Sequence, residues 1–411
     1  MRRVAVTGIG AISPLGNTVD DAFENAAAGR SAIRRLEEPW AGRLSSPLAA
    51  SVKFEGEAHF EPQRLRMLDR VSQFAVVAAR QAMTGAHGRE AGFGPDRMGV
   101  FLGTGMGSAR TTDDGYRVIY GSGAERINPF MVLMAMNNAA AAWVGSEFGV
   151  TGPNLTYSTA CSSAAVAIGE AWRRVARGEL DLAIAGGAEA PLTYGTLKAW
   201  EALHTLARED RADVSASCKP FAANRCGMVL AEGAAFFVLE DFERAAARGA
   251  PIRGEFAGFG LATDLAHITR PSVAGQVAAI RAALRSADMA PEEVDHINAH
   301  GTGTQANDGV ETASIKEVFG QRAYAIPVSA TKSMHGHLLG ATGALELALS
   351  LLTLERGVLL PTMHLEVAAP ECDLDYVPNV ARRGVSVRSV MSNSFAFGGT
   401  NAVLIARAAQ A

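Results

Sequence analysis

The segment NLTYSTACSSAAVAIGEAWRRVARG, residues 154–178, determines how the rest of the chain is interpreted. It opens with a short run typical of a buried strand. After Cys161, apolar residues recur at the three- and four-residue spacing of one helix face: Ala165, Ile168, Trp172 and Val175. Gly178, shortly after a group of arginines, is a suitable helix end, because glycine and cations both favour a helix carboxyl terminus. The segment therefore predicts a strand that turns directly into a helix, with Cys161 at the turn.

Short apolar runs alternate with Ala-rich helical stretches over the whole chain, which is the pattern of α/β proteins. The first set of predicted strands comprises residues 4–8, 98–103, 154–158, 182–185 and 235–239. The second set comprises residues 254–261, 294–299, 326–329, 387–392 and 402–406. A polar and basic segment, residues 241–251, separates the two sets.

The two sets repeat one order of features. In each set a strand leads into Gly-Thr-Gly, at residues 103–105 and again at 301–303. A later strand then leads into a polar turn, with Cys161 in the first set and Lys332 in the second, followed by an apolar helix. This order predicts an internal duplication.

The helix predicted over residues 338–354 is apolar almost all round, so we expect it to be buried at the centre of the molecule. We place the two halves at residues 1–250 and 251–411. The amino-terminal half holds Cys161, and the carboxyl-terminal half holds the candidate residues that follow below.

The composition limits the class of protein. The chain has 411 residues, 48% of them hydrophobic and 19% charged, and a formal net charge of −4. These values argue against disorder and give no electrostatic reason to expect a nucleic-acid partner. The four cysteines show no zinc-ligand spacing and are typical of reduced thiols. The apolar stretch 131–144 is interrupted by asparagines and is too short for a membrane span. We expect a cytoplasmic protein without a membrane partner.

Cys161 is the first candidate for chemistry. A helix amino terminus presents free backbone N–H groups and a partial positive charge. Both favour the thiolate, which is the nucleophilic form of cysteine. The alternative is a small side chain that only fills space at a helix start. The strand-turn-helix context favours the nucleophile, and Cys218, Cys226 and Cys372 lack this context.

A second candidate group, residues 298–304, follows another predicted strand and reads Asn-Ala-His-Gly-Thr-Gly-Thr. Its glycines allow close approach of a ligand to the backbone, while Thr302 and Thr304 offer hydroxyl groups. His300 is either a site residue or an internally bonded structural histidine, and the pattern alone leaves both interpretations open.

A third group is Ser-Ala-Thr-Lys-Ser-Met-His-Gly-His at residues 329–337. Lys332 precedes the buried apolar helix, and Glu346 inside that helix is its expected partner, because a buried charge needs compensation. His335 and His337 could suggest a metal pair, but no cysteine or carboxylate nearby completes a ligand set, so we expect no metal.

The fourth group, residues 393–401, is a Gly-rich loop with two aromatic residues, Phe395 and Phe397. It is either a gate or a tight turn. The chain has neither a dinucleotide-binding nor a phosphate-binding glycine motif. A cysteine nucleophile with two histidines and a buried lysine then favours acyl transfer through a thioester.

These motifs, from the amino-terminal strand to residues 397–401, resemble those of the elongating β-ketoacyl–acyl carrier protein synthases, members of the thiolase superfamily. The resemblance implies an α/β, thiolase-like fold with two duplicated βαβαβαββ halves in five α-β-α-β-α layers. It also implies an acyl carrier protein partner and a homodimer, or a heterodimer with a chain-length-factor-like subunit. It implies no cofactor, since substrates are carried on the phosphopantetheine of the carrier protein.

The resemblance also implies site roles. The implied catalytic residues are Cys161, His300, Lys332 and His337, with Glu346 in support, and the implied substrate-binding residues are Thr302, Thr304, Phe397, Phe395 and Met106. Cys161 would accept the acyl chain, with its oxyanion held by the backbone N–H groups of Cys161 and Phe397. The histidines would promote decarboxylation of malonyl–carrier protein. Arg64, Arg66 and Arg70 are candidates for docking an acidic carrier protein, or they form an ordinary solvated face.

The chain departs from the family pattern at three positions. Ala396 replaces a usual Gly, His335 replaces a usual Thr, and Met106 replaces a common Ile. These departures suggest a specialised pathway. Two alternatives to a condensing enzyme remain. A non-catalytic chain-length partner usually lacks the cysteine that this chain keeps, and a thiolase acting on coenzyme A esters normally has a second catalytic cysteine, which Cys372 does not match.

Overall fold

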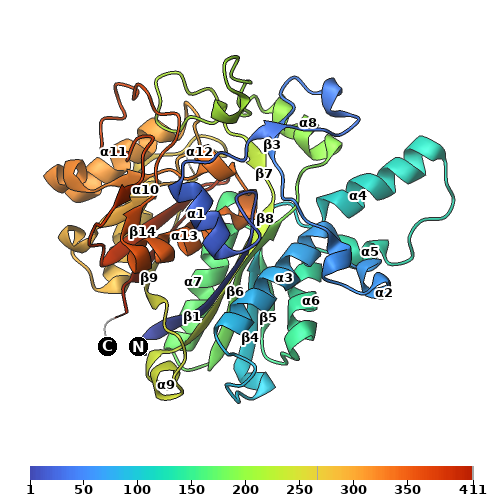
Figure 1. Ribbon diagram of the computed structural model, residues 1–411, viewed down its shortest axis with the longest axis horizontal. Coiled ribbons are helices and arrows are strands. Elements are labelled where there is room, and N and C mark those ends of the chain that lie inside the picture. Colours follow the sequence, from blue (N-terminus) through green and yellow to red (C-terminus); the bar gives the residue numbers. More distant parts are fainter. Residues whose placement is uncertain (266, 410–411) are drawn as a thin grey trace.

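The computed structural model describes residues 1–265 and 267–409. Its main sheet contains ten strands in the order β11-β10-β14-β15-β9-β1-β8-β6-β4-β5 (Figure 1). The bounds of these strands are β1 (Val4–Ile12), β4 (Met98–Gly103), β5 (Asn154–Tyr157), β6 (Leu182–Glu189), β8 (Gly233–Asp241), β9 (Gly254–Thr263), β10 (His296–Asn298), β11 (Val328–Ser329), β14 (Ser389–Phe395) and β15 (Thr400–Arg407). Every strand predicted from the sequence is present, with ends that differ by a few residues.

The sheet consists of two halves with the same topology. In chain order, the strands of each half are arranged 1-5-4-2-3. In this order, the first three strands of each half pair with one another in antiparallel fashion, and the last three pair in parallel fashion. The halves join where β1 pairs with β9 through Val4–Val6. The duplication predicted from the sequence is therefore visible in the sheet. The division at residues 250 and 251 lies between α9 and β9, and it stays a prediction.

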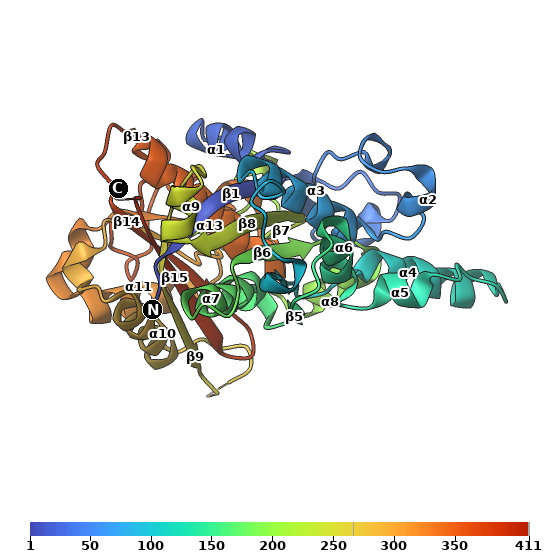
Figure 2. The same cartoon turned by 90° about the horizontal axis from the view of Figure 1, so that it is seen from below.

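Helices cover both faces of the sheet (Figure 2). Their bounds are α1 (Val19–Ala27), α2 (Pro62–Leu65), α3 (Arg70–Gly85), α4 (Ala109–Tyr116), α5 (Met131–Ala135), α6 (Ala139–Phe148), α7 (Ser163–Ala176), α8 (Tyr194–Ala202), α9 (Phe242–Ala247), α10 (Val273–Ala287), α11 (Asp308–Phe319), α12 (Lys332–His335) and α13 (Thr342–Arg356). One apolar core joins α3 and α6 to the amino-terminal strands, and another joins α10 and α11 to the carboxyl-terminal strands. The largest core surrounds α7 and α13 and includes strands of both halves.

The two halves of the sheet lie on either side of α7 and α13, and the other helices cover their outer faces. This arrangement gives the five expected layers, with α7 and α13 in the middle. The sequence explains the middle layer, because α13 has almost no polar face and every residue from Thr342 to Leu354 is buried. Strand β8 is likewise buried along its whole length, as expected for a strand covered by helices on both faces.

Some features were not predicted. Short strands form two small extra sheets, which contain β2 (Arg34–Arg35), β3 (Leu48–Ala50) and β7 (Leu230–Ala231), and β12 (Val358–Leu359) and β13 (Arg382–Arg383). An arm formed by α4, α5 and the chain between them extends away from the body in both views (Figures 1 and 2). Its exposed apolar side chains include Tyr120, Val132 and Leu133.

Within the part of the chain that the structure describes, no helix is long and apolar enough to cross a membrane.

The contact between α7 and β9 gives a test of the central packing. A Cβ added at Gly169 would lie 2.3 Å from the ring of Phe259, so Gly169→Ala forces the ring or the helix to move. We expect a loss of roughly 1–3 kcal/mol in the free energy of unfolding, measured by denaturant titration. Gly85→Ala at the end of α3 is the control, because a Cβ there meets nothing within 4 Å. Equal stability of the two variants would contradict this packing.

Candidate active site

Cys161 lies at the turn that the sequence predicts. β5 ends at Tyr157, a 3-10 turn spans Ala160–Ser162, and α7 begins at Ser163. Ala160 has a φ of 52°, which is unfavourable for a residue with a Cβ and marks a sharp, constrained turn. The Ser163 hydroxyl accepts a hydrogen bond from Thr159 N at 2.9 Å and donates to Ala160 O at 2.6 Å. These bonds fix the turn and aim the Cys161 side chain into the molecule.

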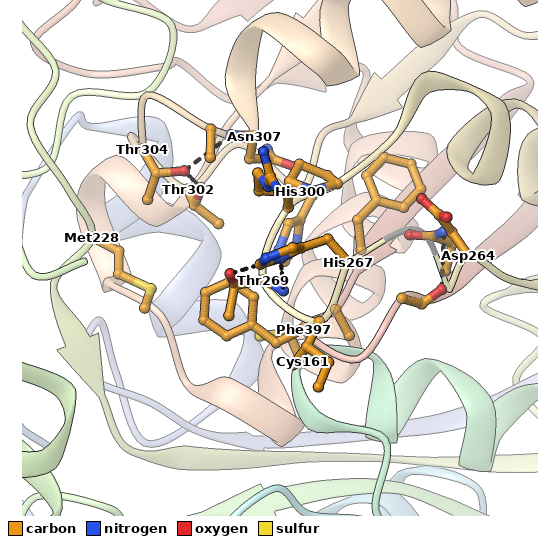
Figure 3. A pocket seen from close by; sticks show the side chains of 18 of the residues that line it. Cys161, Met228, Asp264, His267, Thr269, His300, Thr302, Thr304, Asn307 and Phe397 are labelled. Carbon is orange, nitrogen blue, oxygen red and sulfur yellow. Dashed lines mark hydrogen bonds between the residues drawn. The ribbon is translucent and has the colours of Figure 1, made fainter. Parts of the chain in front are cut away.

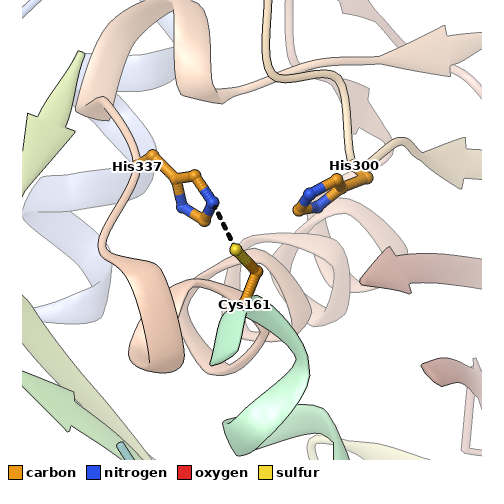
Figure 4. A group of neighbouring side chains, drawn as sticks. All are labelled: Cys161, His300 and His337. Atoms are coloured by element: carbon orange, nitrogen blue, oxygen red, sulfur yellow. Dashed lines mark hydrogen bonds between the residues drawn. The ribbon is translucent and has the colours of Figure 1, made fainter. Parts of the chain in front are cut away.

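His337 reaches Cys161 from the other half of the chain (Figure 4). Its Nε2 lies 3.1 Å from Cys161 Sγ. Its Nδ1 accepts the backbone N–H of Leu339 at 3.1 Å. A neutral imidazole with Nδ1 as acceptor carries its proton on Nε2, so this backbone contact makes the Nε2–H of His337 a donor toward Cys161.

His300 approaches the same point from the end of β10. Its ring centroid is 5.5 Å from that of His337, and the two rings are nearly perpendicular. Lys332 Nζ lies 3.5 Å from His300 Nδ1 and donates to His300 O at 2.5 Å. An ammonium beside Nδ1 requires that nitrogen to be the acceptor, so His300 also carries its proton on Nε2.

Lys332 and Glu346 form the predicted pair. Lys332 Nζ lies 2.7 Å from Glu346 Oε1, and neither side chain is exposed to solvent. Burial raises the pKa of Glu346 to about 7, and the charge of Lys332 counteracts that rise. The pair lies beside His300, whose Nδ1 and carbonyl oxygen Lys332 contacts.

Both histidines are held neutral. Burial is the main cause that lowers their pKa values well below the ordinary range, and the charge of Lys332 adds to the effect. The site therefore presents two neutral N–H donors beside one sulfur atom. Such donors stabilise negative charge that develops on a substrate oxygen.

Burial of Cys161 opposes the expected thiolate. Burial raises the pKa of Cys161 to about 11, because the side chain is only 6% exposed. The Lys332 charge and the backbone N–H of Phe397 lower the pKa of Cys161 by less than burial raises it. The backbone N–H groups at the turn lower the pKa of Cys161, as the helix start predicts, but burial raises it by more, so the thiol is favoured near neutral pH.

These groups line one pocket (Figure 3). Besides Cys161, His300 and His337, the pocket is lined by predicted residues, namely Thr302, Thr304, Phe395 and Phe397. Its cavity is only about 60 Å³, room for about two water molecules. An acyl chain therefore requires side chains to move.

Met106 lies outside this pocket lining, and its side chain is 43% exposed. Its backbone N–H donates to Glu189 Oε1 at 2.9 Å. A role for Met106 in the acyl pocket stays a prediction.

Two buried carboxylates at the site were not predicted from the sequence. Glu311 on α11 accepts the backbone N–H groups of His300 at 2.8 Å and Gly301 at 2.9 Å, and so fixes the histidine loop. Glu189 at the end of β6 accepts those of Gly105 at 2.6 Å and Gly340 at 2.9 Å, and so joins the two halves. The sequence signal for Glu189 is a single charge at the end of an apolar strand, whereas Glu311 lies in a helix with other charged residues and has no such signal.

The segment between β9 and α10 was also missed. His267 and Thr269 line the pocket mouth, and the Thr269 N–H donates to His267 Nδ1 at 3.1 Å. Met228 and Asn307 complete the wall on the other side. A loop of this kind has no periodic pattern that would mark it as part of a site.

His335 does not share a site with His337. Its Nδ1 donates to Gly336 O at 2.7 Å, and its Nε2 lies 2.9 Å from Thr331 Oγ1. A different group, Cys161 with His300 and His337, has ligand atoms within 4.8 Å of one another. Because both Nε2 atoms there carry protons, neither offers the lone pair that a metal needs.

The arginine candidates for carrier-protein docking have structural partners. Arg64 pairs with Glu147 at 2.7 Å, and Arg70 pairs with Glu232 at 2.8 Å. Arg66 is exposed. Of the three, Arg66 best fits a docking role, and that role stays a prediction.

The pKa of Cys161 gives a testable pH dependence. A raised thiol pKa leaves the thiolate scarce at neutral pH, so alkylation by iodoacetamide should accelerate about tenfold per pH unit from about pH 7 to about pH 9. Mass spectrometry of the Cys161 peptide measures the rate. The exposed Cys226, labelled in the same sample, is the internal reference. A rate at Cys161 that is already constant above pH 7 would contradict the raised pKa.

Comparison with known proteins gives one consistent result. The family model described as "Beta-ketoacyl synthase, N-terminal domain" matches residues 1–245, and "Beta-ketoacyl synthase, C-terminal domain" matches residues 253–366. The chain is 42% identical to nodulation protein E of Rhizobium meliloti (strain 1021), covering 98% of each chain. It is 40% identical to 3-oxoacyl-[acyl-carrier-protein] synthase 2 of Staphylococcus aureus (strain N315), again over 98% of each.

Solved structures agree. A β-ketoacyl synthase from Burkholderia phymatum STM815 matches with a TM-score of 0.92 at 34% identity, covering 100% of both chains. A type II polyketide ketosynthase in complex with its acyl-carrier protein, AntDE:AntF, and the ishigamide ketosynthase/chain length factor also match with TM-scores of 0.92, at 31% and 34% identity over 100% of both chains. From its motifs, its duplicated fold and these relatives together, we conclude that the chain belongs to the β-ketoacyl synthase family.

Proposed function

We propose that this protein is a β-ketoacyl–acyl carrier protein synthase, which extends an acyl chain by two carbons with malonyl–acyl carrier protein as donor. The observation that carries the proposal is the convergence of one buried thiol and two neutral N–H donors, with Nε2 of His337 only 3.1 Å from Cys161 Sγ. The relatives named as 3-oxoacyl-[acyl-carrier-protein] synthase 2 support the same chemistry.

In the first half-reaction Cys161 Sγ attacks the thioester carbonyl of an acyl–carrier protein. A new C–S bond forms, the bond to the pantetheine sulfur breaks, and the thiol proton of Cys161 ends on the released carrier-protein thiol. The backbone N–H groups of Cys161 and Phe397 both lower the pKa of Cys161, and we assign them to hold the oxyanion of the tetrahedral intermediate.

In the second half-reaction malonyl–carrier protein enters the same pocket. Its carboxylate leaves as CO₂, and the electron pair of the broken C–C bond forms an enolate at the thioester. The Nε2–H groups of His300 and His337 donate to the enolate oxygen. The enolate carbon then attacks the acyl group on Cys161, and the cysteine sulfur leaves and recovers a proton.

Lys332 supports this chemistry from beside His300. It keeps His300 Nδ1 as an acceptor and helps hold both histidines neutral, so that they donate hydrogen bonds rather than protons. Glu346 fixes Lys332 at 2.7 Å. In this assignment Lys332 is a positioning residue and the two histidines are the catalytic ones.

The remaining assignments follow from the same proposal. The two halves are residues 1–250 and 251–411, each built around one repeat of the sheet. Substrates arrive on the phosphopantetheine of an acyl carrier protein, and no separate cofactor takes part. The reaction takes place in the cytoplasm, in a fatty acid or specialised polyketide pathway.

A dimer is the favoured assembly. The apolar arm is exposed in the single chain, and β5 is an edge strand whose residues Asn154 and Leu155 are exposed. Unpaired sheet edges and large apolar patches are usually covered by a partner. A homodimer is the first candidate. A heterodimer is the second, because two matching structures are described as a ketosynthase with its chain length factor.

Removing the nucleophile tests the proposal directly. Cys161→Ala should abolish acyl transfer to the protein and lower condensation by at least about 10³-fold, because no covalent intermediate can form. Intact-protein mass spectrometry with a panel of acyl–carrier proteins measures the first effect, and product analysis with malonyl–carrier protein measures the second. Cys226→Ala, which changes an exposed thiol outside the pocket lining, is the control. Unchanged turnover of Cys161→Ala would disprove the function.

The threonines at the pocket give a separate test. Thr302 Oγ1 and Thr304 Oγ1 lie 2.9 Å apart, and we assign them to the pantetheine arm. Thr302→Val should raise the KM for malonyl–carrier protein about two- to tenfold, the cost of one hydrogen bond. Alkylation of Cys161 by iodoacetamide should stay unchanged. Thr84→Val on the exposed face of α3 is the matched control. An unchanged KM would remove the assignment of Thr302.

A further inference from the structure

Trp200 stacks on the aromatic ring of the loop that closes over Cys161. Its ring centroid lies 5.9 Å from that of Phe397, and the planes differ by 21°. Trp200 belongs to α8, far from Phe397 in the sequence, and no motif singled it out. Phe397 lines the pocket next to Cys161 (Figure 3).

The tryptophan is the fixed half of this pair. Helix α8 starts with Thr193, whose side chain accepts the backbone N–H of Thr196. Near its end, Glu201 accepts the backbone N–H and the hydroxyl of Ser45, and it pairs with Lys198 at 2.7 Å. Trp200 itself packs on an apolar cluster whose buried members are Leu44, Leu197, Met228, Leu230 and Leu339.

Phe397 lies in the turn between β14 and β15. It is followed by Gly398 and Gly399, with φ of 84° and 76°, values that side chains with a Cβ rarely adopt. Within the loop, Gly399 N donates to Ala396 O at 3.1 Å. Gly398 N donates to Ile268 O, on the segment between β9 and α10, at 2.8 Å. Phe397 lies outside the paired residues of β14 and β15, so the contact of its ring with Trp200 contributes to the position of that ring.

One residue thus carries two linked functions. The backbone N–H of Phe397 lowers the pKa of Cys161, while the ring of Phe397 stacks on Trp200. Rotating the backbone at Phe397 to move the ring would also turn the N–H away from Cys161. The stack therefore favours the arrangement in which the N–H is aligned and the pocket is closed.

The apolar cluster beside Trp200 indicates which kind of ligand the position of Phe397 affects, namely an aliphatic chain. Met228 belongs both to this cluster and to the lining of the pocket, and Leu339 lies two residues beyond His337. The cavity at Cys161 is about 60 Å³ and Phe397 is part of its wall, so an aliphatic chain needs side chains of this wall to move.

We propose that Trp200 is a positioning residue that holds the ring of Phe397 in the pocket wall beside Cys161, and that it thereby limits how readily aliphatic chains reach the thiol. The expected effect of Trp200 on turnover rests on the proposed function. Access to the thiol is independent of the reaction that the enzyme catalyses.

Two alkylating reagents test access. Iodoacetamide and N-dodecyl iodoacetamide both displace iodide at Cys161 Sγ and need no oxyanion stabilisation. We expect Trp200→Ala to raise the labelling rate of Cys161 by the dodecyl reagent, relative to iodoacetamide, about two- to tenfold, the range that one aromatic stack accounts for. Trp200→Phe keeps an aromatic partner and should restore the wild-type ratio within about twofold.

Turnover gives the second readout. With acyl– and malonyl–carrier proteins, Trp200→Ala should lower kcat about two- to tenfold with little change in KM, because the Phe397 N–H is aligned less often. Trp40→Ala is the matched control, since Trp40 packs on the same cluster but stacks on Tyr194. Melting temperatures of all variants show whether the fold is intact.

The outcomes separate clearly. An unchanged labelling ratio in Trp200→Ala would overturn the proposal, as would Trp200→Phe behaving like Trp200→Ala or Trp40→Ala reproducing the effect. Absence of condensation in the wild type would instead contradict the proposed function, and the labelling ratios would still decide the role of Trp200.

Discussion

The fully buried pair of Lys332 and Glu346 is the interaction on which the geometry of the site depends. Burying either charge alone would cost several kcal/mol, so each side chain fixes the position of the other. Glu346 belongs to α13 at the centre of the molecule, while Lys332 reaches both the carbonyl and Nδ1 of His300. Through this single ammonium group, the central helix sets the orientation and the tautomer of a histidine on a separate loop.

The second histidine reaches the same protonation state by a different route. His337 has a backbone N–H, that of Leu339, in the place where His300 has an ammonium group. Burial then keeps both imidazoles neutral. The same burial raises the pKa of Cys161, so it favours the thiol form beside the two donors. Such a site is suited to stabilising anions that form only during reaction, rather than a standing negative charge.

Sequence patterns predicted most of the fold and the centre of the site. The strands were recognisable because each is a short apolar run, and α13 because it lacks a polar face. Cys161, His300, Lys332 and His337 stood out since each follows a strand end within a Gly-rich or Ser-rich turn.

Other parts of the site left no such pattern. Glu189 and Glu311 act by accepting backbone N–H groups, and backbone donors are the same in every sequence. The raised pKa of Cys161 depends on how much protein surrounds it, which the local helix start does not reveal. The stack of Trp200 on Phe397 joins positions that are close only in the folded chain.

The repeated topology explains how a duplicated fold came to hold one asymmetric site. The second and third strands in chain order of each half lie at opposite edges of the sheet, but the turns that follow them supply Cys161, His300 and Lys332 to one site. After the third strand, β5 leads to Cys161, whereas β11 leads to Lys332. After the second strand, β4 leads to the loop of Met106, whereas β10 leads to His300.

Equivalent turns thus supply Cys161 and the loop of Met106 from one half, and Lys332 and His300 from the other. Glu189 ties these contributions together, since it accepts N–H groups from Gly105 in the first half and Gly340 in the second. Neither half contains a complete site, so the chemistry requires both repeats to stay packed around α13.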